Sequence, residues 1–469
     1  MPRILVIIVN WNKKQFLENL LTQLEEQRPP DFSVAVVDNA STDGSQEMVK
    51  TKFPKVTLIE NETNLGGTGG FNTGLRYGLE TGGFDYFWLL DNDVVLHEGA
   101  LQALLEEAEK DTSIAIVGPK LLDLDNPDYV QEIGVKFDWK DGSLLQIDAG
   151  KNRDDYRCYD VDYVASCCLL ARVETIRKIG LWDPVYFVTW DDMDWCYRFK
   201  RAGYRVIATS KAIVEHASFE GRRFSSPLVK FYYWSRNELY FFSKFTQGFQ
   251  RIRVPLSRLR WMLDAIAQYR VAGDRVSAFY ITHAMTDFFR GKMGAAKTMT
   301  PPPSSPDLAL RVERLKKKKG KLIFVPPPNR ELTHTFLTYI RKHFTDFDVD
   351  VFVPYKYVSL REVEIPNAIR VPFLSLFSRL KFLRRISRAY DAVIEVETSF
   401  KFFFQYCIPQ RIVLEEDGSH QVFYNSPVDI VRFMTAKFRV LLALPFYAIR
   451  FWLKPRKTVA HEGESHQEA

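Results

Sequence analysis

The chain has 469 residues, of which 46% are hydrophobic and 26% charged, and its formal net charge is +6. This length is too great for one compact core, so we expect two or three domains. The composition excludes a fibrous or disordered chain, and the mild positive charge falls short of a nucleic-acid-binding protein, so we expect no nucleic-acid partner.

The N-terminal run Ile4–Val9 is too short for a signal peptide and predicts a first strand. Strand-like runs then alternate with stretches whose apolar residues recur at threes and fours. The expected strands are Ile4–Val9, Ser33–Asp38, Val56–Ile59, Tyr86–Leu90 and Ile114–Val117, and the expected helices are Lys14–Glu26, Gly44–Thr51, Gly70–Glu80 and Glu98–Lys110. This alternation predicts an α/β fold with a Rossmann-like, mostly parallel sheet between helices.

The compartment is predicted from cysteines and hydropathy. Five cysteines without CxxC spacing argue against a disulfide framework or a zinc site and fit a reducing compartment. No segment reaches the roughly 20 apolar residues of a membrane span. We therefore expect a cytoplasmic protein, with peripheral contact at the inner face of the cell membrane as an open alternative.

Two carboxylates, Asp91 and Asp93, follow the apolar run Tyr86–Leu90. Ligands of open α/β sheets bind outside the carboxyl ends of the strands, so these acids are well placed to hold a divalent cation and a phosphate. A solvated turn is the alternative, because Asp and Asn dominate turns. Asp38, at the end of the second strand, also has two interpretations. It could accept hydrogen bonds from a nucleotide base or ribose, or it could be a turn residue.

Four glycines lie within five positions of the segment Asn64–Gly74, which opens a predicted helix. Missing side chains allow the backbone to approach a ligand closely, and the free N–H groups of a helix start favour anions. The segment lacks the Gly-Lys-Ser/Thr ending of a Walker loop. A mobile surface loop is the alternative.

Four motifs occur in the order and spacing of family 2 inverting glycosyltransferases: Val6–Asn12, Val36–Ser45, Asn64–Asn72 and Leu89–Asp93. The chain resembles that family. The resemblance implies a GT-A fold, a nucleotide-diphospho-sugar donor and Asp93 as the metal-binding acid. It assigns the nucleotide-sugar to Val9, Asn10, Asp38, Asn64, Gly70, Asn72, Asp91 and Asn92.

Three acids within four positions, Asp191, Asp192 and Asp194, begin an amphipathic helix. Acids are favoured in a first helical turn by the helix dipole, which is the structural alternative for Asp191 and Asp194. The segment resembles the family's aromatic-x-x-Trp-Glu/Asp-Asp-x-Asp motif. The resemblance implies that Asp192 is the general base, that Asp191 is its catalytic neighbour, and that Trp190 and Asp194 lie on the acceptor side.

His216 follows another apolar run and lies 24 residues beyond Asp192. A lone histidine there is usually a capping or satisfied polar residue. Similarity to galactofuranosyltransferases and related rhamnosyltransferases implies instead that His216 completes the metal site with Asp93. The cofactor would be Mn²⁺ or Mg²⁺, and imidazole suits Mn²⁺ better.

We divide the chain into five regions: a GT-A catalytic domain (1–222), a helical extension (223–297), a Pro/Lys-rich linker (298–320), a smaller α/β domain with a basic amphipathic end (321–457) and a disordered tail (458–469). The arginine-rich helices of the extension fit either a membrane-surface element or a solvated charged face. The segment Lys437–Lys457 fits either interfacial docking or burial against the second domain. No motif assigns chemistry to that domain.

The resemblance predicts a metal-dependent inverting glycosyltransferase that uses UDP-galactofuranose or dTDP-rhamnose. The acceptor would be a glycan or lipid-linked glycan of a cell-surface polysaccharide. A nucleotidyltransferase would need basic residues gripping a triphosphate in the glycine-rich segment, and none is present there. The alternative from another class is a catalytically silent glycan-binding or membrane-docked assembly subunit.

Overall fold

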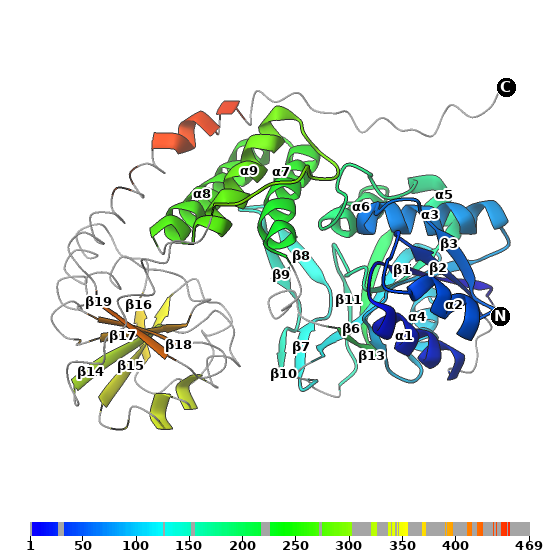
Figure 1. Ribbon diagram of the computed structural model, residues 1–469, viewed down its shortest axis with the longest axis horizontal. Helices are drawn as coiled ribbons and strands as arrows, with labels where there is room; N and C mark the ends of the chain where they lie inside the picture. Colours follow the sequence, from blue (N-terminus) through cyan, green and yellow to red (C-terminus); the bar gives the residue numbers. More distant parts are fainter. Residues whose placement is uncertain are drawn as a thin grey trace. The chain divides into compact units, whose positions relative to one another are not determined.

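Figure 1 shows a computed structural model of the chain, which divides into two compact units. The first comprises Met1–Met262, Tyr280–Thr300 and Phe446–Ala469, and the second Leu263–Phe279 and Pro301–Pro445. The structure describes residues 2–302 apart from 27–31, 125–126, 152–154, 217–225 and 272–273, and beyond 302 it describes residues 320–325, 336–338, 340–342, 345, 347–354, 368–371, 390, 392–396, 410–414, 420–424, 435, 438, 442–447, 449 and 450. Most of the predicted linker, the predicted tail and much of the segment Lys437–Lys457 lie outside these residues, and the five predicted regions stay a prediction.

The first unit begins with the predicted alternation of strands and helices. The elements are β1 (Ile4–Asn10), α1 (Lys14–Glu26), β2 (Phe32–Asp38), α2 (Ser45–Lys52), β3 (Thr57–Glu60), α3 (Gly66–Thr81) and β4 (Tyr86–Asp91). The four strands are parallel in the order β4-β1-β2-β3. β1 is apolar from Ile4 to Val9 because both of its faces are covered: Leu5 and Ile7 belong to one core, and Val6 and Ile8 belong to the other, with the leucines of α1.

Antiparallel strands extend this parallel layer. The further elements are β5 (Val95–Leu96), α4 (Ala100–Ala108), β6 (Ile114–Asp123), β7 (Tyr129–Glu132), β10 (Gly150–Lys151), β11 (Cys158–Asp160), β12 (Cys168–Arg172), α5 (Val173–Ile179), α6 (Asp191–Arg201) and β13 (Arg205–His216). β12 lies antiparallel between β4 and β6, and β13 runs parallel to β6. The hairpin of β8 (Val135–Asp138) and β9 (Ser143–Gln146) forms a separate two-stranded sheet. The α/β class and the Rossmann-like layer are confirmed.

Strand register gathers the polar residues at one edge of the sheet. Asn10 is aligned with Asp38, and Val9 with Asp91, so β1, β2 and β4 end side by side. β13 pairs antiparallel with β5, with Glu215 opposite Val95. This pairing carries the end of β13 to the turn that follows β4.

The helical extension follows as η1 (Leu228–Tyr233, a π-helix), α7 (Trp234–Phe245), α8 (Gln250–Val271) and α9 (Arg275–Arg290). No helix among the described residues meets the length and hydropathy of a membrane span.

The second unit contains a six-stranded sheet. Its strands are β14 (Gly320–Val325), β15 (Phe347–Pro354), β16 (Ala368–Val371), β17 (Ala392–Val396), β18 (Gln410–Leu414) and β19 (His420–Tyr424). Their order is β16-β15-β14-β17-β18-β19, and every pair is parallel except β18 with β19. The second unit thus has a mostly parallel sheet of its own, and the predicted domain 321–457 stays a prediction.

Candidate active site

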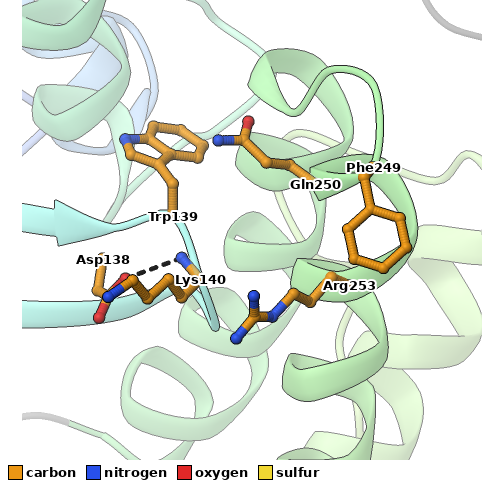
Figure 2. Close-up of a pocket in the computed structure, with 6 residues that line it drawn as sticks. All are labelled: Asp138, Trp139, Lys140, Phe249, Gln250 and Arg253. Carbon is orange, nitrogen blue, oxygen red and sulfur yellow. Dashed lines mark hydrogen bonds between the residues drawn. The ribbon is translucent and has the colours of Figure 1, made fainter.

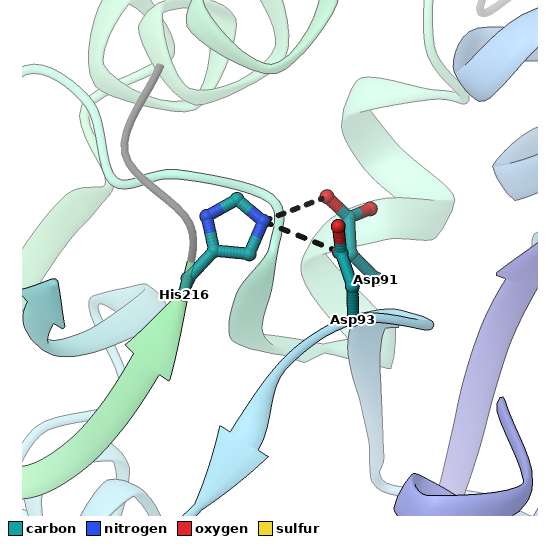
Figure 3. Close-up of side chains that lie close together, drawn as sticks. All are labelled: Asp91, Asp93 and His216. Atoms are coloured by element: carbon teal, nitrogen blue, oxygen red, sulfur yellow. Dashed lines mark ion pairs between the residues drawn. The ribbon is translucent and has the colours of Figure 1, made fainter. Parts of the chain in front are cut away.

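Asp91, Asp93 and His216 form a cluster with the donor set of a divalent metal site (Figure 3). One ligand atom from each residue lies within 4.8 Å of the others. Nε2 of His216 is 3.3 Å from Oδ1 of Asp93 and 3.7 Å from Oδ2 of Asp91. Two carboxylates and an imidazole suit Mn²⁺. Asp93 and His216 are buried while Asp91 is partly exposed, so the cluster opens to one side.

Lys13 also reaches this cluster, which the sequence patterns did not predict. Its Nζ is 2.5 Å from Oδ2 of Asp93 and its side chain is 38% exposed. Burial alone would raise the pKa of Asp93, but hydrogen bonds and charges of His216 and Lys13 hold that pKa well below its usual range. Asp93 is therefore an ionised carboxylate.

Asn10, Asp38 and Asn92 form a buried hydrogen-bond chain beside the cluster. Nδ2 of Asn92 donates to Oδ1 of Asn10 at 2.7 Å, and Nδ2 of Asn10 donates to Oδ2 of Asp38 at 2.8 Å. Oδ1 of Asp38 accepts from the Ser41 backbone N–H and from Nε2 of Gln46. The network fixes the ends of three strands relative to one another. Asp38 is thus more than a solvated turn residue, and its contact with a nucleotide stays a prediction.

The glycine-rich segment forms the first turns of α3 and is not a mobile loop. α3 begins at Gly66, four residues earlier than predicted, and Oδ1 of Asn64 accepts the Gly66 N–H at 2.8 Å. Added Cβ atoms at Gly70 and Gly74 would lie 2.5 Å from Val9 Cγ1 and 2.3 Å from Ile7 Cγ2. Close packing of α3 on β1 therefore explains these glycines. The nucleotide-sugar contacts predicted for Val9, Asn64 and Gly70 stay predictions.

The segment before α6 has an unusual backbone. Three of its residues have a positive φ, which residues other than glycine rarely adopt: 72° at Phe187, 63° at Thr189 and 65° at Trp190. Asn237 of α7 holds this segment by donating to the carbonyls of Tyr186, Val188 and Thr189.

Gly66 supports the same segment from the other side. A Cβ atom on Gly66, whose φ is +71°, would lie 2.1 Å from the Phe187 carbonyl oxygen. The backbone N–H of Thr68 donates to that oxygen at 3.2 Å. Sequence reasoning missed Asn237 and the role of Gly66, because both act through contacts between distant segments.

Asp191 and Asp192 follow this strained segment at the start of α6. Oδ2 of Asp191 accepts from Oγ1 of Thr68 at 2.6 Å, in the first turns of α3. Burial and the charge of Asp192 raise the pKa of Asp191 to about 7. Burial also raises the pKa of Asp192, against opposing hydrogen bonds. In the described residues no cation pairs with either carboxylate in an ion pair.

Asp192 is only partly buried and has partners of its own. Its Oδ2 accepts from the backbone N–H and Oγ of Ser166 and from the hydroxyl of Tyr163, each at 3.2 Å. Burial and the negative charge of Asp192 raise the pKa of Glu132 to about 8, so Glu132 is mostly protonated at pH 7. Tyr163, Ser166 and Glu132 precede Asp192 by 26 residues or more and lie outside the motif at the start of α6.

Both residues predicted for the acceptor side are buried. Asp194 is completely buried, and it forms ion pairs with Arg198 at 2.8 Å and Lys244 at 2.6 Å. Trp190 is 1% exposed and packs against Trp234 and Phe242. These contacts hold α6 in place, and a direct contact of either residue with an acceptor stays a prediction.

The amide of Asn72 forms two hydrogen bonds within the protein. Its Nδ2 donates to the Trp182 carbonyl and its Oδ1 accepts the Trp182 N–H, both at 2.9 Å. Asn72 is 5% exposed. It therefore joins α3 to the segment before α6, and its contact with a nucleotide-sugar stays a prediction.

Residues 5–180 match the model of the family described as Glycosyl transferase family 2. The N-terminal part of the chain is thus similar to glycosyltransferases of family 2, and this match together with the named relatives identifies the chain as a glycosyltransferase.

Two curated relatives come from mycobacteria. The chain is 25% identical over 229 residues to an N-acetylglucosaminyl-diphospho-decaprenol L-rhamnosyltransferase of Mycobacterium tuberculosis, covering 45% of this chain and 75% of that protein. It is 26% identical over 203 residues to the galactofuranosyltransferase GlfT1 of Mycolicibacterium smegmatis, covering 42% and 65%. The chain thus spans just under two thirds of GlfT1.

Solved structures give a weaker likeness. A crystal structure of GalNAc-T7 with UDP, GalNAc and Mn²⁺ matches at a TM-score of 0.44 and 13% identity, over 61% of this chain and 56% of that one. The mannosyltransferase PcManGT of Pyrobaculum calidifontis, in complex with GDP-Man and Mn²⁺, matches at 0.39 and 16%, over 61% and 74%. Likeness at this level says nothing about the substrates of this chain.

Proposed function

We propose that the protein is a metal-dependent inverting glycosyltransferase whose general base is Asp192. Its donor would be UDP-galactofuranose or dTDP-rhamnose, and its acceptor a glycan or lipid-linked glycan of a cell-surface polysaccharide. The named relatives, a rhamnosyltransferase and a galactofuranosyltransferase, support this choice of sugars. Peripheral contact with the inner face of the cell membrane belongs to the same proposal.

One observation carries the proposal: two carboxylate groups of opposite electrostatic character border the same edge of the sheet. The cluster of Asp91, Asp93 and His216 has the donors for a cation, while Asp192 has a raised pKa and is partly exposed. A raised pKa suits a general base. In this proposal the cluster of Asp91, Asp93 and His216 acts on the leaving group, and Asp192 acts on the nucleophile.

Asp91, Asp93 and His216 would hold Mn²⁺ or Mg²⁺, which supplies Lewis-acid neutralisation of a departing nucleotide diphosphate. Asp192 would accept the proton of the acceptor hydroxyl while that oxygen attacks the anomeric carbon from the face opposite the diphosphate. The bond from the anomeric carbon to the donor phosphate oxygen breaks as the new glycosidic bond forms, so the configuration inverts. Ser166 and Tyr163 orient Asp192 through their hydrogen bonds.

The test is turnover of a panel of UDP-, dTDP- and GDP-sugars with Mn²⁺ or Mg²⁺ by the wild type and by Asp192→Asn. We expect metal-dependent release of one nucleoside diphosphate that Asp192→Asn abolishes. A membrane extract serves as the source of acceptor. If no nucleotide-sugar is bound or turned over even with this extract, the enzyme proposal fails and the silent binding subunit takes its place.

A further inference from the structure

A hollow of about 400 Å³ lies between the β8–β9 turn and the start of α8 (Figure 2). Asp138, Trp139 and Lys140 line it from the turn, and Phe249, Gln250 and Arg253 line it from α8. Every lining residue belongs to the first unit. The proposed donor and base residues are not among them, so the hollow is separate from the candidate active site.

Large apolar side chains are exposed around this hollow. Phe249 is 75% exposed, Ile252 50% and Trp261 40%. Ile252, Arg253 and Arg260 follow Phe249 by 3, 4 and 11 residues, which places these four along one side of the helix, with Trp261 about a third of a turn away. We call the six residues Lys140, Phe249, Ile252, Arg253, Arg260 and Trp261 the α8 surface.

The opposite side of α8 fixes the orientation of this surface. Val254, Leu259 and Met262 are completely buried. Arg258 pairs with the buried Glu238 at 2.5 Å and lies over the Trp261 ring at 5.2 Å. The exposed residues are therefore presented by a firmly packed helix.

The charge of the α8 surface is positive. The stretch from Gln247 to Leu263 contains four arginines and no acid. No carboxylate in the described part of the chain forms an ion pair with Arg253 or Arg260. Two acids occur in the adjacent turn, and both are used locally: Asp138 accepts the Lys140 N–H, and Asp141 accepts from Ser143.

A solvated face of a helix ordinarily mixes both signs of charge and exposes few large apolar residues. Phe and Trp among arginines fit instead the boundary of a bilayer, where rings enter the headgroup region and guanidinium groups meet lipid phosphates. We propose that the α8 surface docks the protein on a membrane of anionic phospholipid.

Aromatic contacts connect the hollow to the start of α6. Trp139 contacts Phe242 at 5.9 Å between ring centroids, and Phe242 contacts Trp190 at 5.6 Å. Trp190 directly precedes the carboxylates at the start of α6. Docking here would bring a membrane-embedded acceptor towards Asp192, and this consequence rests on the proposed function.

The experiment measures co-sedimentation of the full chain with vesicles of phosphatidylcholine containing 30% phosphatidylglycerol, and with pure phosphatidylcholine. We expect binding to the anionic vesicles only. Arg253→Gln/Arg260→Gln and Phe249→Ser are expected to weaken binding, on the order of fivefold for each charge removed. Arg76→Gln/Arg177→Gln is the matched control, because it removes two exposed arginines elsewhere on the first unit.

Donor hydrolysis in vesicle-free solution separates this proposal from the enzyme proposal. All of these variants are expected to keep wild-type hydrolysis, since none contacts the candidate active site. If the α8 variants bind anionic vesicles like the wild type, or the control loses as much binding, or the wild type ignores lipid charge, the docking proposal is overturned. Vesicle binding without donor hydrolysis would overturn the enzyme proposal and leave docking intact.

Discussion

The candidate active site contains two pairs of aspartates, Asp91 with Asp93 and Asp191 with Asp192, in opposite electrostatic surroundings. Asp93 faces His216 and Lys13, which hold its pKa well below the usual range although it is buried. Asp191 and Asp192 face each other and neutral hydroxyl groups, and burial raises the pKa of both. Burial therefore does not decide the protonation state, and the presence or absence of a neighbouring cation does.

This difference has a functional consequence. A carboxylate that is ionised at every physiological pH is suited to bind a cation, because binding then requires no loss of a proton from the carboxyl group. A carboxyl group that titrates near neutrality suits proton transfer. A substitution in either pair of aspartates alone should therefore remove cation binding or proton transfer and leave the other function intact.

The largest effect is expected for Asp192→Asn. Sugar transfer should fall about 10³-fold, because an amide does not accept the acceptor proton. Mn²⁺ binding should remain, since Asp192 is not part of the metal cluster. Transfer followed by product chromatography and Mn²⁺ binding followed by electron paramagnetic resonance test the two halves. Loss of both together would show that the groups are not separate.

The reciprocal change, Asp93→Asn, should reduce Mn²⁺ affinity at least tenfold, because the cluster loses an ionised ligand. The same resonance titration measures it. Asp111→Asn is the control, because Asp111 pairs with Arg205 away from the cluster. An unchanged affinity in Asp93→Asn would contradict the metal assignment.

The sequence predicted more of the metal cluster than of the acceptor side, for a physical reason. Asp91 and Asp93 lie at and just beyond the end of a strand. In a parallel sheet the carboxyl ends of the strands meet at one edge, so the position of these two acids could be inferred from local patterns. The contact between Thr68 and Asp191 joins residues 123 positions apart. No local pattern encodes such a pairing.

Three predicted contacts gain no support from the structure, for a related reason. Trp190, Asp194 and Asn72 stand within or near recognised motifs, but their side chains are enclosed by partners from elsewhere in the chain. The motif gave their neighbourhood correctly and could not show which way each side chain points. A helix start places successive residues in different directions, so Asp192 reaches the surface while Asp191 and Asp194 are buried.

A smaller effect is expected for Lys13→Met. In the absence of donor the Lys13 ammonium group neutralises Asp93, so its removal should tighten Mn²⁺ binding, by roughly fivefold for a unit charge in a solvent-like dielectric. Lys14→Met is the matched control, since the neighbouring Lys14 forms no ion pair with the cluster among the described residues. Weaker Mn²⁺ binding in Lys13→Met would show that Lys13 supports the site and does not compete for it.

The smallest effect is expected for Thr68→Val, which removes the hydroxyl that donates to Asp191. This hydrogen bond favours the ionised carboxylate and lowers the pKa of Asp191, so the variant should have a higher pKa there. In the wild type we expect Asp191 to ionise at about pH 7. In Thr68→Val this ionisation, followed by nuclear magnetic resonance of the Asp191 carboxyl carbon, should move upward by about one pH unit, the equivalent of one hydrogen bond to a charged group.

The pH–rate profile distinguishes this electrostatic effect from a loss of structure. The rates of wild type and Thr68→Val should converge at pH 9, where the carboxyl groups of both are ionised, whereas a misplaced helix would lower the rate at every pH. Thr73→Val is the control, because its hydroxyl lies on the same helix and bonds to Gly69 and Asn61. A lower pKa of Asp191 in Thr68→Val would mean that the Thr68 hydroxyl stabilises the protonated form of the Asp191–Asp192 pair. This pair would then differ from Asp93 by more than burial accounts for.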